Sequence, residues 1–377
     1  MIRLDDARQS LNAALLRAPG GFAWWYVELL GEGGDGLVLI WSFGLPFLPG
    51  YTSAARRGEG EAAGQRPSLN VALYRAGRLD AYVLHEFQEE EARWSGNEWR
   101  FGQTHIRLSC EDGQGSLEVD LDCPLRGSSG SIRGRVRVGG PFTSLASGAA
   151  RTSLGSQEHA WTPVLCPAFG TASLQLPDGQ RVCVSGRAYH DRNGSPHTLD
   201  ALGFRLWAWG HCAMQERERI FYVLWPREAD DASPLVAGFE LGCDGVITPV
   251  EGLTAKLDKP RKTLLGMQTW RSIELWEGGR RWMTLPLRKP VDHGPFYLRY
   301  LGKATMEGEP CCCEASAEVI DPSRVDLGAH RFFVKMRVAS DQRENSMWLP
   351  LFQGPKAGRV GRLLRSVFGG KAPKELT

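Results

Sequence analysis

Two short segments near the middle of the chain carry side chains suited to acid–base chemistry. The first is His159-Ala160-Trp161 and the second is Tyr189-His190-Asp191-Arg192-Asn193. On β-strands, residues two positions apart point to the same face, so His159 and Trp161 share one direction and Tyr189 and Asp191 share another. If both strands line one cavity, a carboxyl, an imidazole, a phenol and an indole meet there. Spacing alone favours a polar turn in which Asp191 caps local backbone groups.

A carboxyl group in a dry, aromatic pocket could act as a Brønsted acid on an alkene. Burial penalises the carboxylate anion and raises the pKa of the group well above its usual range. The tertiary carbocation formed by protonation is stabilised over aromatic rings, by roughly 0.5–2 kcal/mol for each cation–π contact. The hypothesis is that Asp191 donates the proton, that Tyr189 or Asn193 orients it, and that His159 accepts a proton at the end of the reaction.

Large flat side chains are frequent, with 13 Trp, 15 Phe and 8 Tyr, and many fall in strand-like segments. Such residues can wall a long apolar cavity, although any single Trp is also ordinary strand and core material. Besides Asn193, the candidates for substrate contacts are aromatic residues of two segments: Trp24, Trp25, Tyr26, Trp207 and Trp209. Trp24, Trp25 and Trp161 are the candidates for stabilising a cation.

The charge and cysteine content argue against a nucleic-acid partner and against a disulfide-stabilised fold. Forty-five Lys and Arg against 43 Asp and Glu give a formal charge of +2, far from the basic excess of a nucleic-acid binder. The nine cysteines show no CxxC pairs and no disulfide-scaffold density, so we expect reduced thiols in a cytoplasmic protein. We expect neither an export signal nor a membrane span, because the sequence shows no cleavable apolar leader and no apolar run of about 18 residues.

Motifs for metal, nucleotide or nucleophile chemistry do not occur in the sequence. The eight histidines form no His-x-x-x-His pattern, and there is no Gly-x-Ser-x-Gly elbow, no P-loop and no GxGxxG after a strand. We therefore expect neither a metal nor an organic cofactor.

Short β-strands punctuated by turns dominate the sequence pattern. Residues 36–43, 69–74, 116–121 and 131–138 are β-rich or alternate apolar with polar residues. This rhythm predicts an all-β fold with two antiparallel barrel or sandwich domains, residues 1–197 and 198–355. Helical patterns are limited to residues 6–17 and to a short basic amphipathic tail, residues 356–377, that could rest on anionic lipid or dock on its own protein.

Four ordered segments resemble the carotenoid 1,2-hydratases, or hydroxyneurosporene synthases, and their lipocalin-like relatives. They are Gly20 to Glu28, Leu69 to Tyr74, His159-Ala160-Trp161 and Tyr189 to Asn193. The resemblance covers residues 1–225 well and the remainder loosely. It implies two lipocalin-like β domains, no organic cofactor, and the addition of water across a terminal isoprenoid double bond.

Residue by residue, the resemblance implies an acid–base group of His159, Trp161, Tyr189 and Asp191. One departure lies beside this group: the family pattern usually places one residue between its Asn and the next Gly, whereas here Gly194 follows Asn193 directly. The departure puts the geometry of this loop in question.

Related folds also catalyse cationic or Diels–Alder ring closures, so the fold does not settle the reaction. Three functions stay open: a cofactor-independent hydratase of a carotenoid or terpenoid, a terpenoid or polyene cyclase, and a non-catalytic carrier. Product mass separates the first two, because hydration adds one water, and a carrier would bind ligand without depending on Asp191. In each, the partner is a hydrophobic small molecule, and the basic tail could give peripheral contact with the inner face of a membrane.

Overall fold

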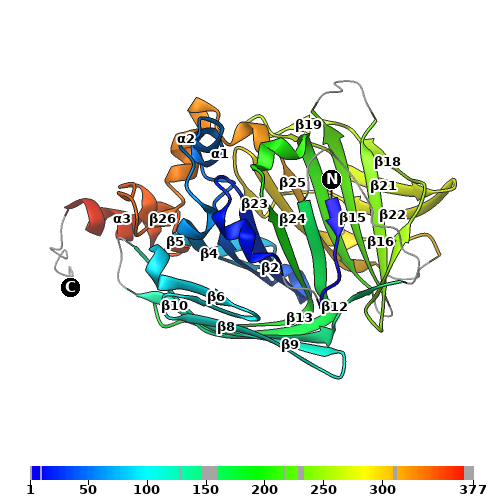
Figure 1. Ribbon diagram of the computed structural model, residues 1–377, viewed down its shortest axis with the longest axis horizontal. Helices are drawn as coiled ribbons and strands as arrows, with labels where there is room; N and C mark the ends of the chain where they lie inside the picture. Colours follow the sequence, from blue (N-terminus) through cyan, green and yellow to red (C-terminus); the bar gives the residue numbers. More distant parts are fainter. Residues whose placement is uncertain are drawn as a thin grey trace, which may run out of the picture.

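The computed structural model describes residues 2–8, 11–126, 130–146, 159–214, 217–227, 233–308 and 312–368. Two large, mainly antiparallel sheets share an apolar core, and two smaller sheets lie beside the second one (Figure 1). The described helices are few and short: α1 (Tyr51–Arg56), α2 (Gly328–Lys335) and α3 (Arg359–Phe368), besides some 3-10 turns. No helix in the described ranges has the length and apolar character needed to cross a membrane.

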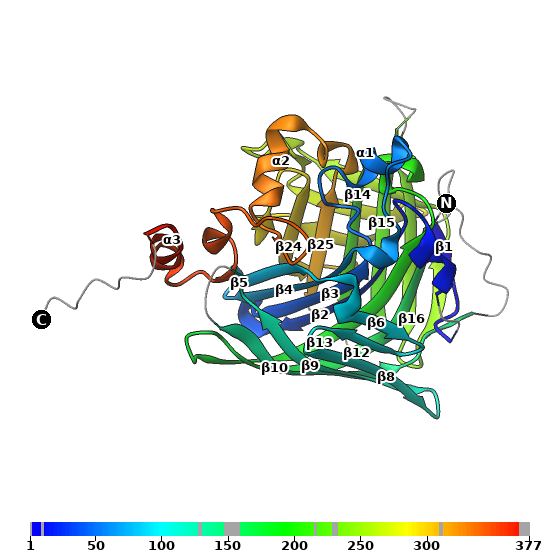
Figure 2. The same cartoon turned by 60° about the vertical axis from the view of Figure 1, so that its left-hand side comes forward.

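The first large sheet has fourteen strands and curls on itself (Figure 2). Its main path runs β26-β5-β4-β3-β2-β13-β12-β10-β9-β8-β7-β6, with β1 paired to β12 and β27 paired to β5. Its strands are β1 (Ile2–Leu4), β2 (Phe22–Gly31), β3 (Gly36–Phe43), β4 (Pro67–Arg75), β5 (Arg78–Glu86), β6 (Ala92–Ser95), β7 (Glu98–Phe101), β8 (Thr104–Glu111), β9 (Gln114–Pro124), β10 (Ser131–Pro141), β12 (His159–Gln175), β13 (Arg181–Ser195), β26 (Ala339–Ser340) and β27 (Gly354–Pro355).

The second large sheet has eight strands in the order β11-β17-β16-β15-β14-β25-β24-β23. They are β11 (Ser144–Leu145), β14 (Phe204–Ala213), β15 (Arg217–Pro226), β16 (Leu235–Gly242), β17 (Val246–Val250), β23 (Asp292–His293), β24 (Tyr297–Ala304) and β25 (Cys313–Ile320). The smaller sheets contain β18 (Leu253–Asp258), β21 (Ser272–Glu277) and β22 (Arg280–Pro286), and the pair β19 (Arg261–Lys262) and β20 (Gln268–Thr269).

Strand β9 shows how the residue pattern gives the curled sheet an apolar inner face and a charged outer face. Leu117 and Val119 are buried, whereas Glu118 between them is exposed. Successive residues of a strand point to opposite faces, so the apolar set packs inside the curl and the charged set faces water. The register with β10 places Arg137 opposite Glu118, where its Nε donates to Oε1 over 3.1 Å.

Strand β2, in contrast, is buried on both faces and separates two cores. Trp25 and Val27 belong to the core inside the curl of the large sheet. Trp24 and Tyr26 face the core shared by the two large sheets. Residues that are neighbours in sequence therefore line different compartments.

The structure confirms the all-β fold and the short helix in the basic tail, where α3 covers Arg359–Phe368 and residues 369–377 lie outside the described part. The boundary predicted at residue 197 falls between β13 and β14, which belong to different sheets. Short strands join segments across it, because β11 pairs with β17 and both β26 and β27 pair with β5. Of residues 6–17, the described positions form only the 3-10 helix Ala13–Arg17.

Candidate functional site

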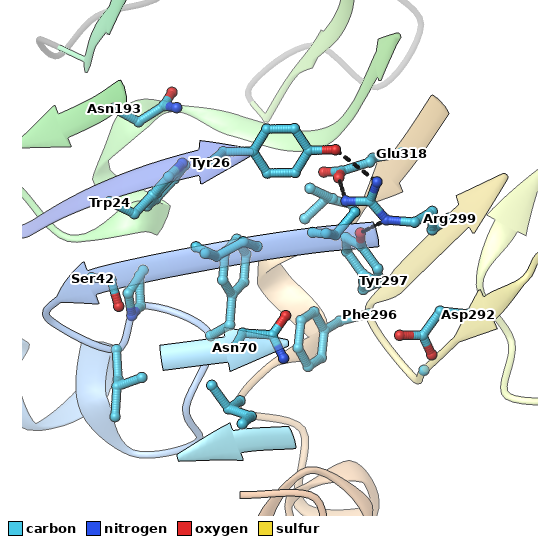
Figure 3. A pocket seen from close by; sticks show the side chains of 18 of the residues that line it. Trp24, Tyr26, Ser42, Asn70, Asn193, Asp292, Phe296, Tyr297, Arg299 and Glu318 are labelled. Carbon is cyan, nitrogen blue, oxygen red and sulfur yellow. Dashed lines mark hydrogen bonds and ion pairs between the residues drawn. The ribbon is translucent and has the colours of Figure 1, made fainter. Parts of the chain in front are cut away.

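A cavity of about 230 Å³ lies between the two large sheets, and its walls are mostly apolar. Figure 3 shows Trp24 and Asn193 towards one end, Arg299, Glu318 and Asp292 towards the other, and Tyr26 between them. The walls come from strands β2, β3, β4, β5, β12 and β13 of the first sheet and β14, β15, β23, β24 and β25 of the second, with α2 contributing Val334.

The strand register explains why the residues predicted from the sequence meet. Asn193 of β13 lies opposite Trp161 of β12 and opposite Trp24 of β2, and Asp191 lies opposite Tyr26. Directly paired residues share a face of the sheet, and residues two positions along each strand share it too. Seven side chains therefore project from the same face of three adjacent strands: His159, Trp161, Tyr189, Asp191, Asn193, Trp24 and Tyr26.

Asp191 is buried and accepts hydrogen bonds from three uncharged donors. The indole Nε1 of Trp161 and the hydroxyl of Tyr189 each donate to Oδ2 over 2.9 Å. The amide Nδ2 of Asn193 donates to Oδ1 over 3.0 Å. Asp191 and Asn193 line the cavity, while Trp161 and Tyr189 hold the carboxyl group from behind the wall.

Burial sets the proton affinity of this carboxyl group. Loss of water penalises the anion and raises the pKa of Asp191 to about 7, against the opposing effect of the hydrogen bonds from Trp161 and Tyr189. A large fraction of the molecules therefore carry a protonated Asp191 at neutral pH. Two donors already occupy Oδ2 and only one occupies Oδ1, so the proton is best placed on the free lone pair of Oδ1.

His159 is the second titratable group at this end of the cavity. Burial lowers its pKa to about 4, although its hydrogen bond with Asn193 opposes this, so the imidazole is neutral at pH 7. The Asn193 amide donates through Nδ2, which leaves Oδ1 to accept from His159 Nε2 over 3.0 Å. This tautomer keeps the lone pair on Nδ1, so His159 can accept a proton there.

Aromatic rings line the cavity around Asp191. The wall includes four of the residues predicted to contact substrate: Trp24, Tyr26, Trp207 and Trp209. Tyr222 of β15 also lines it and packs edge-on against Trp161, with ring centroids 5.1 Å apart. Trp161, predicted to stabilise a cation, does not line the cavity and instead donates to the Asp191 carboxyl group from behind the wall.

Trp25, a predicted substrate contact, does not line the cavity between the two large sheets. Trp25 lies on the opposite face of β2, where its ring packs edge-on against Trp94 and Trp99 in the core of the curl. Side chains alternate along a strand, so Trp24 and Trp25 cannot both face one cavity. Gly194, where the family pattern departs, continues β13 opposite Ala160 and leaves the strand intact.

A second group of buried ionisable residues was not predicted from the sequence. His211 lies between two carboxylates, with Nδ1 2.6 Å from Glu28 Oε1 and Nε2 2.9 Å from Glu218 Oε2. Glu218 also receives hydrogen bonds from Cys166 Sγ and from the Arg187 guanidinium. The available sequence signal was a glutamate inside the otherwise apolar run of β2, at the same strand parity as Tyr26.

Cys166, His211 and Glu218 form the one cluster with metal-ligand chemistry among the residues that the structure describes, their ligand atoms lying within 4.8 Å of one another. Burial lowers the pKa of His211, but the charges and hydrogen bonds of Glu218 and Glu28 outweigh it and raise that pKa to about 9. An imidazolium has no lone pair to offer a metal. In this protonation state the cluster is an ion-pair network that does not fit a metal ion.

A third polar group lies in the cavity away from Asp191. Arg299 donates through Nη1 to the Tyr26 hydroxyl over 2.7 Å and through Nε to the Tyr297 hydroxyl over 2.9 Å, and it pairs with Glu318 (Figure 3). The Tyr26 hydroxyl in turn donates to Glu28 over 2.7 Å. Tyr26 therefore connects the cavity wall to the ion-pair network behind it.

Comparisons with known proteins give a consistent picture. The family model described as carotenoid hydratase CrtC matches residues 39–346. The acyclic carotenoid 1,2-hydratase of Thiocapsa roseopersicina is 25% identical over 299 residues, which cover 78% of this chain and 67% of that protein. The acyclic carotenoid 1,2-hydratase of Rubrivivax gelatinosus is 28% identical over 314 residues, covering 77% of this chain and 67% of that protein.

The fold is also similar to that of a solved structure. A crystal structure of an AttH protein from Nitrosomonas europaea superposes with a TM-score of 0.55 at 14% identity, covering 83% of this chain and 98% of that one. At this identity the match shows a shared fold and carries no information on activity.

Proposed function

Because the chain belongs to the carotenoid hydratase CrtC family, we propose that it adds water to a terminal isoprenoid double bond of an acyclic carotenoid, with Asp191 as the proton donor. One observation carries the proposal: a buried carboxyl group with a pKa of about 7 faces an apolar, aromatic cavity. Such a group is protonated often enough at neutral pH to act as an acid, and it lies where an apolar alkene can reach it.

In the first step, the π electrons of the alkene take the proton from Asp191 Oδ1. A C–H bond forms at the less substituted carbon, and a tertiary carbocation remains at its neighbour. Asp191 becomes a carboxylate, which the donors from Trp161, Tyr189 and Asn193 stabilise without rearranging. The rings of Trp24, Trp207 and Tyr222 offer faces for the cation.

In the second step, a water molecule attacks the cation and loses one proton. His159 Nδ1 accepts that proton and passes it back to Asp191, so both side chains end as they began. The sum of the two steps is the addition of one water to one alkene. No group other than these side chains and water takes part, so EDTA treatment should leave turnover unchanged.

The size of the cavity fits one end of a long polyene. A volume of about 230 Å³ falls below the ~300–1,000 Å³ of pockets that enclose drug-sized ligands. The terminal double bond therefore enters the cavity while the rest of a carotenoid stays outside it.

The test is Asp191→Asn, assayed on acyclic carotenoids with product mass as the readout. Removal of a general acid should lower turnover by about 10²–10⁴-fold. Wild-type product heavier by one water supports hydration, whereas a converted product of unchanged mass would favour a cyclase. Near wild-type turnover by Asp191→Asn would exclude Asp191 as the acid, and ligand binding without conversion by the wild type would indicate a carrier. Trp25→Phe is the matched control, since Trp25 lies on the other face of β2.

A further inference from the structure

Exposed apolar side chains gather on the outside of α2 and on the turn between β19 and β20. Phe332 and Phe333 are 54% and 43% exposed, and their rings pack edge-on with centroids 5.9 Å apart. Leu327, just before α2, is 46% exposed, and Leu264 in the β19–β20 turn is fully exposed. Exposed apolar patches on a soluble protein indicate a binding surface for another apolar partner.

Helix α2 also forms part of the cavity wall. Val334 is buried and lines the cavity, while Phe332 and Phe333 beside it face outward. The exposed pair therefore lies on the outer side of the structure that encloses the candidate site. In Figures 1 and 2, α1 and α2 lie together at one end of the molecule.

Hydrogen bonds join the segment before α2 to the loops that line the cavity. Arg324 donates through Nε to the carbonyl of Pro295, a cavity residue, over 2.7 Å and through Nη2 to the carbonyl of Leu265 over 2.5 Å. Asp326 accepts from the backbone amide of Gly50, at the start of α1, over 2.6 Å. The exposed apolar side chains are thus held in fixed relation to the cavity.

Basic side chains accompany the apolar ones. Lys335 and Arg331 of α2 and Lys262 of β19 are all exposed. Arg331 lies 3.6 Å from Asp326, so its charge is partly balanced. Aromatic residues beside basic ones are the combination that binds the interface of an anionic bilayer.

We propose that Leu264, Leu327, Phe332 and Phe333, with Lys262 and Lys335, form a docking face for an anionic lipid bilayer. The inference rests on the proposed function, because an acyclic carotenoid dissolves in lipid and not in water. Docking through α2 would bring the bilayer against the outer side of the cavity wall. The bilayer that dissolves the polyene would then lie against the element that encloses the candidate site.

Helix α3 is a separate feature. Val360 and Leu364 are exposed on it, but α3 lies away from α1 and α2 in both views (Figures 1 and 2) and beside β26 in Figure 1. The proposed docking face is thus a different surface from the basic tail, whose predicted membrane contact stays a prediction.

The test is vesicle co-sedimentation of the full chain and of the double variant Phe332→Ser/Phe333→Ser. Vesicles of phosphatidylcholine, with and without phosphatidylglycerol, serve as probes. We expect stronger binding to the anionic vesicles, and a loss of about ten-fold or more in the double variant because two aromatic anchors are removed. Phe169→Ser/Leu235→Ser is the matched control, since both residues are exposed on sheets, and it should bind like the wild type.

Turnover measured in micelles and in vesicles tests the docking face and the proposed function separately. With carotenoid in detergent micelles, Phe332→Ser/Phe333→Ser should turn over like the wild type, and with carotenoid in vesicles it should be slower by about the same factor as its binding. Equal vesicle binding by wild type and double variant, or no binding by either, would overturn the docking face. Binding that depends on the Phe pair, without hydration in either medium, would keep the docking face and reject the proposed function.

Discussion

Glu28 and Asp191 are buried carboxyl groups on adjacent strands, and their surroundings differ in charge. Glu28 receives hydrogen bonds from Tyr26, from Ser316 and from His211, with Arg299 Nη1 3.5 Å away. Burial alone would raise the pKa of Glu28, but His211 and Arg299 outweigh it and hold that pKa below its usual range. Asp191 also has three donors, all of them neutral, and its pKa is about 7.

The number of hydrogen bonds is therefore not what separates a structural carboxylate from an acid. Two groups with three donors each differ because only one has a cation within reach. A cation favours the anion strongly in a low-dielectric interior, whereas neutral donors offset the desolvation of the anion only in part. Asp191 keeps a proton to donate because its three hydrogen-bond donors are neutral, whereas the cations His211 and Arg299 lie beside Glu28.

Removal of the cation between Glu28 and Glu218 should have the largest effect on stability. His211→Gln leaves two carboxylates buried without their shared imidazolium, and we expect unfolding free energy at pH 7 to fall by about 5 kcal/mol. The loss should shrink at lower pH, where the carboxylates bind protons. Denaturant titrations at several pH values measure it.

His190→Gln is the matched control for that variant. His190 is equally buried, but burial lowers its pKa to about 4 and its ring Nδ1 meets only the backbone carbonyl of Tyr26. A loss as large as that of His211→Gln, with no dependence on pH, would show that buried imidazole packing and not charge stabilises the first cluster.

The pH dependence of stability should report the proton on Asp191. Its folded pKa of about 7 lies above the unfolded value, so its contribution to stability is complete below the unfolded pKa and is lost as pH rises through 7. Between pH 4 and 8 the wild type should lose up to about 4 kcal/mol relative to Asp191→Asn. Parallel stability curves for the two proteins would show that Asp191 is ionised throughout.

Loss of one neutral donor should have the smallest effect. Tyr189→Phe removes the hydroxyl that donates to Asp191 Oδ2 and keeps the ring. The anion loses support, so the pKa of Asp191 should rise, and the alkaline limb of the activity profile should move up by roughly one pH unit. Tyr82→Phe, at a cavity tyrosine packed against Arg337, should leave the limb in place. If the alkaline limb of the Tyr189→Phe profile does not move, a group other than Asp191 determines that limb.

The sequence predicted the strands well because their alternation is local. Leu117 and Val119 alternate with polar residues, and this pattern alone places them on one face. Helix α2 could not be predicted in the same way, since Arg331 to Val338 contains Phe and Val residues that are common in strands. The segment before α2 contacts distant loops through Asp326 with Gly50 and Arg324 with Pro295, and no local pattern contains these contacts.

The site was predicted in part for a related reason. The convergence of Asp191, Tyr189 and Trp161 follows from strand parity combined with a family likeness, and the structure brings them together. The same alternation predicts that Trp24 and Trp25, as neighbours on one strand, face opposite sides of the sheet. The network of Glu28, His211 and Glu218 depends on strands from two different sheets meeting in space, and no local pattern contains that information.

The pairing of β26 and β27 with β5 has a consequence for biosynthesis. Residues 339–355 close the outer edge of a sheet whose other strands are almost all made in the first half of the chain. While the chain is still being synthesised, β5 presents an open edge with unpaired backbone groups, which is where other strands add and aggregation begins. Residue 355 must therefore be synthesised before the β5 edge of the first sheet is fully paired.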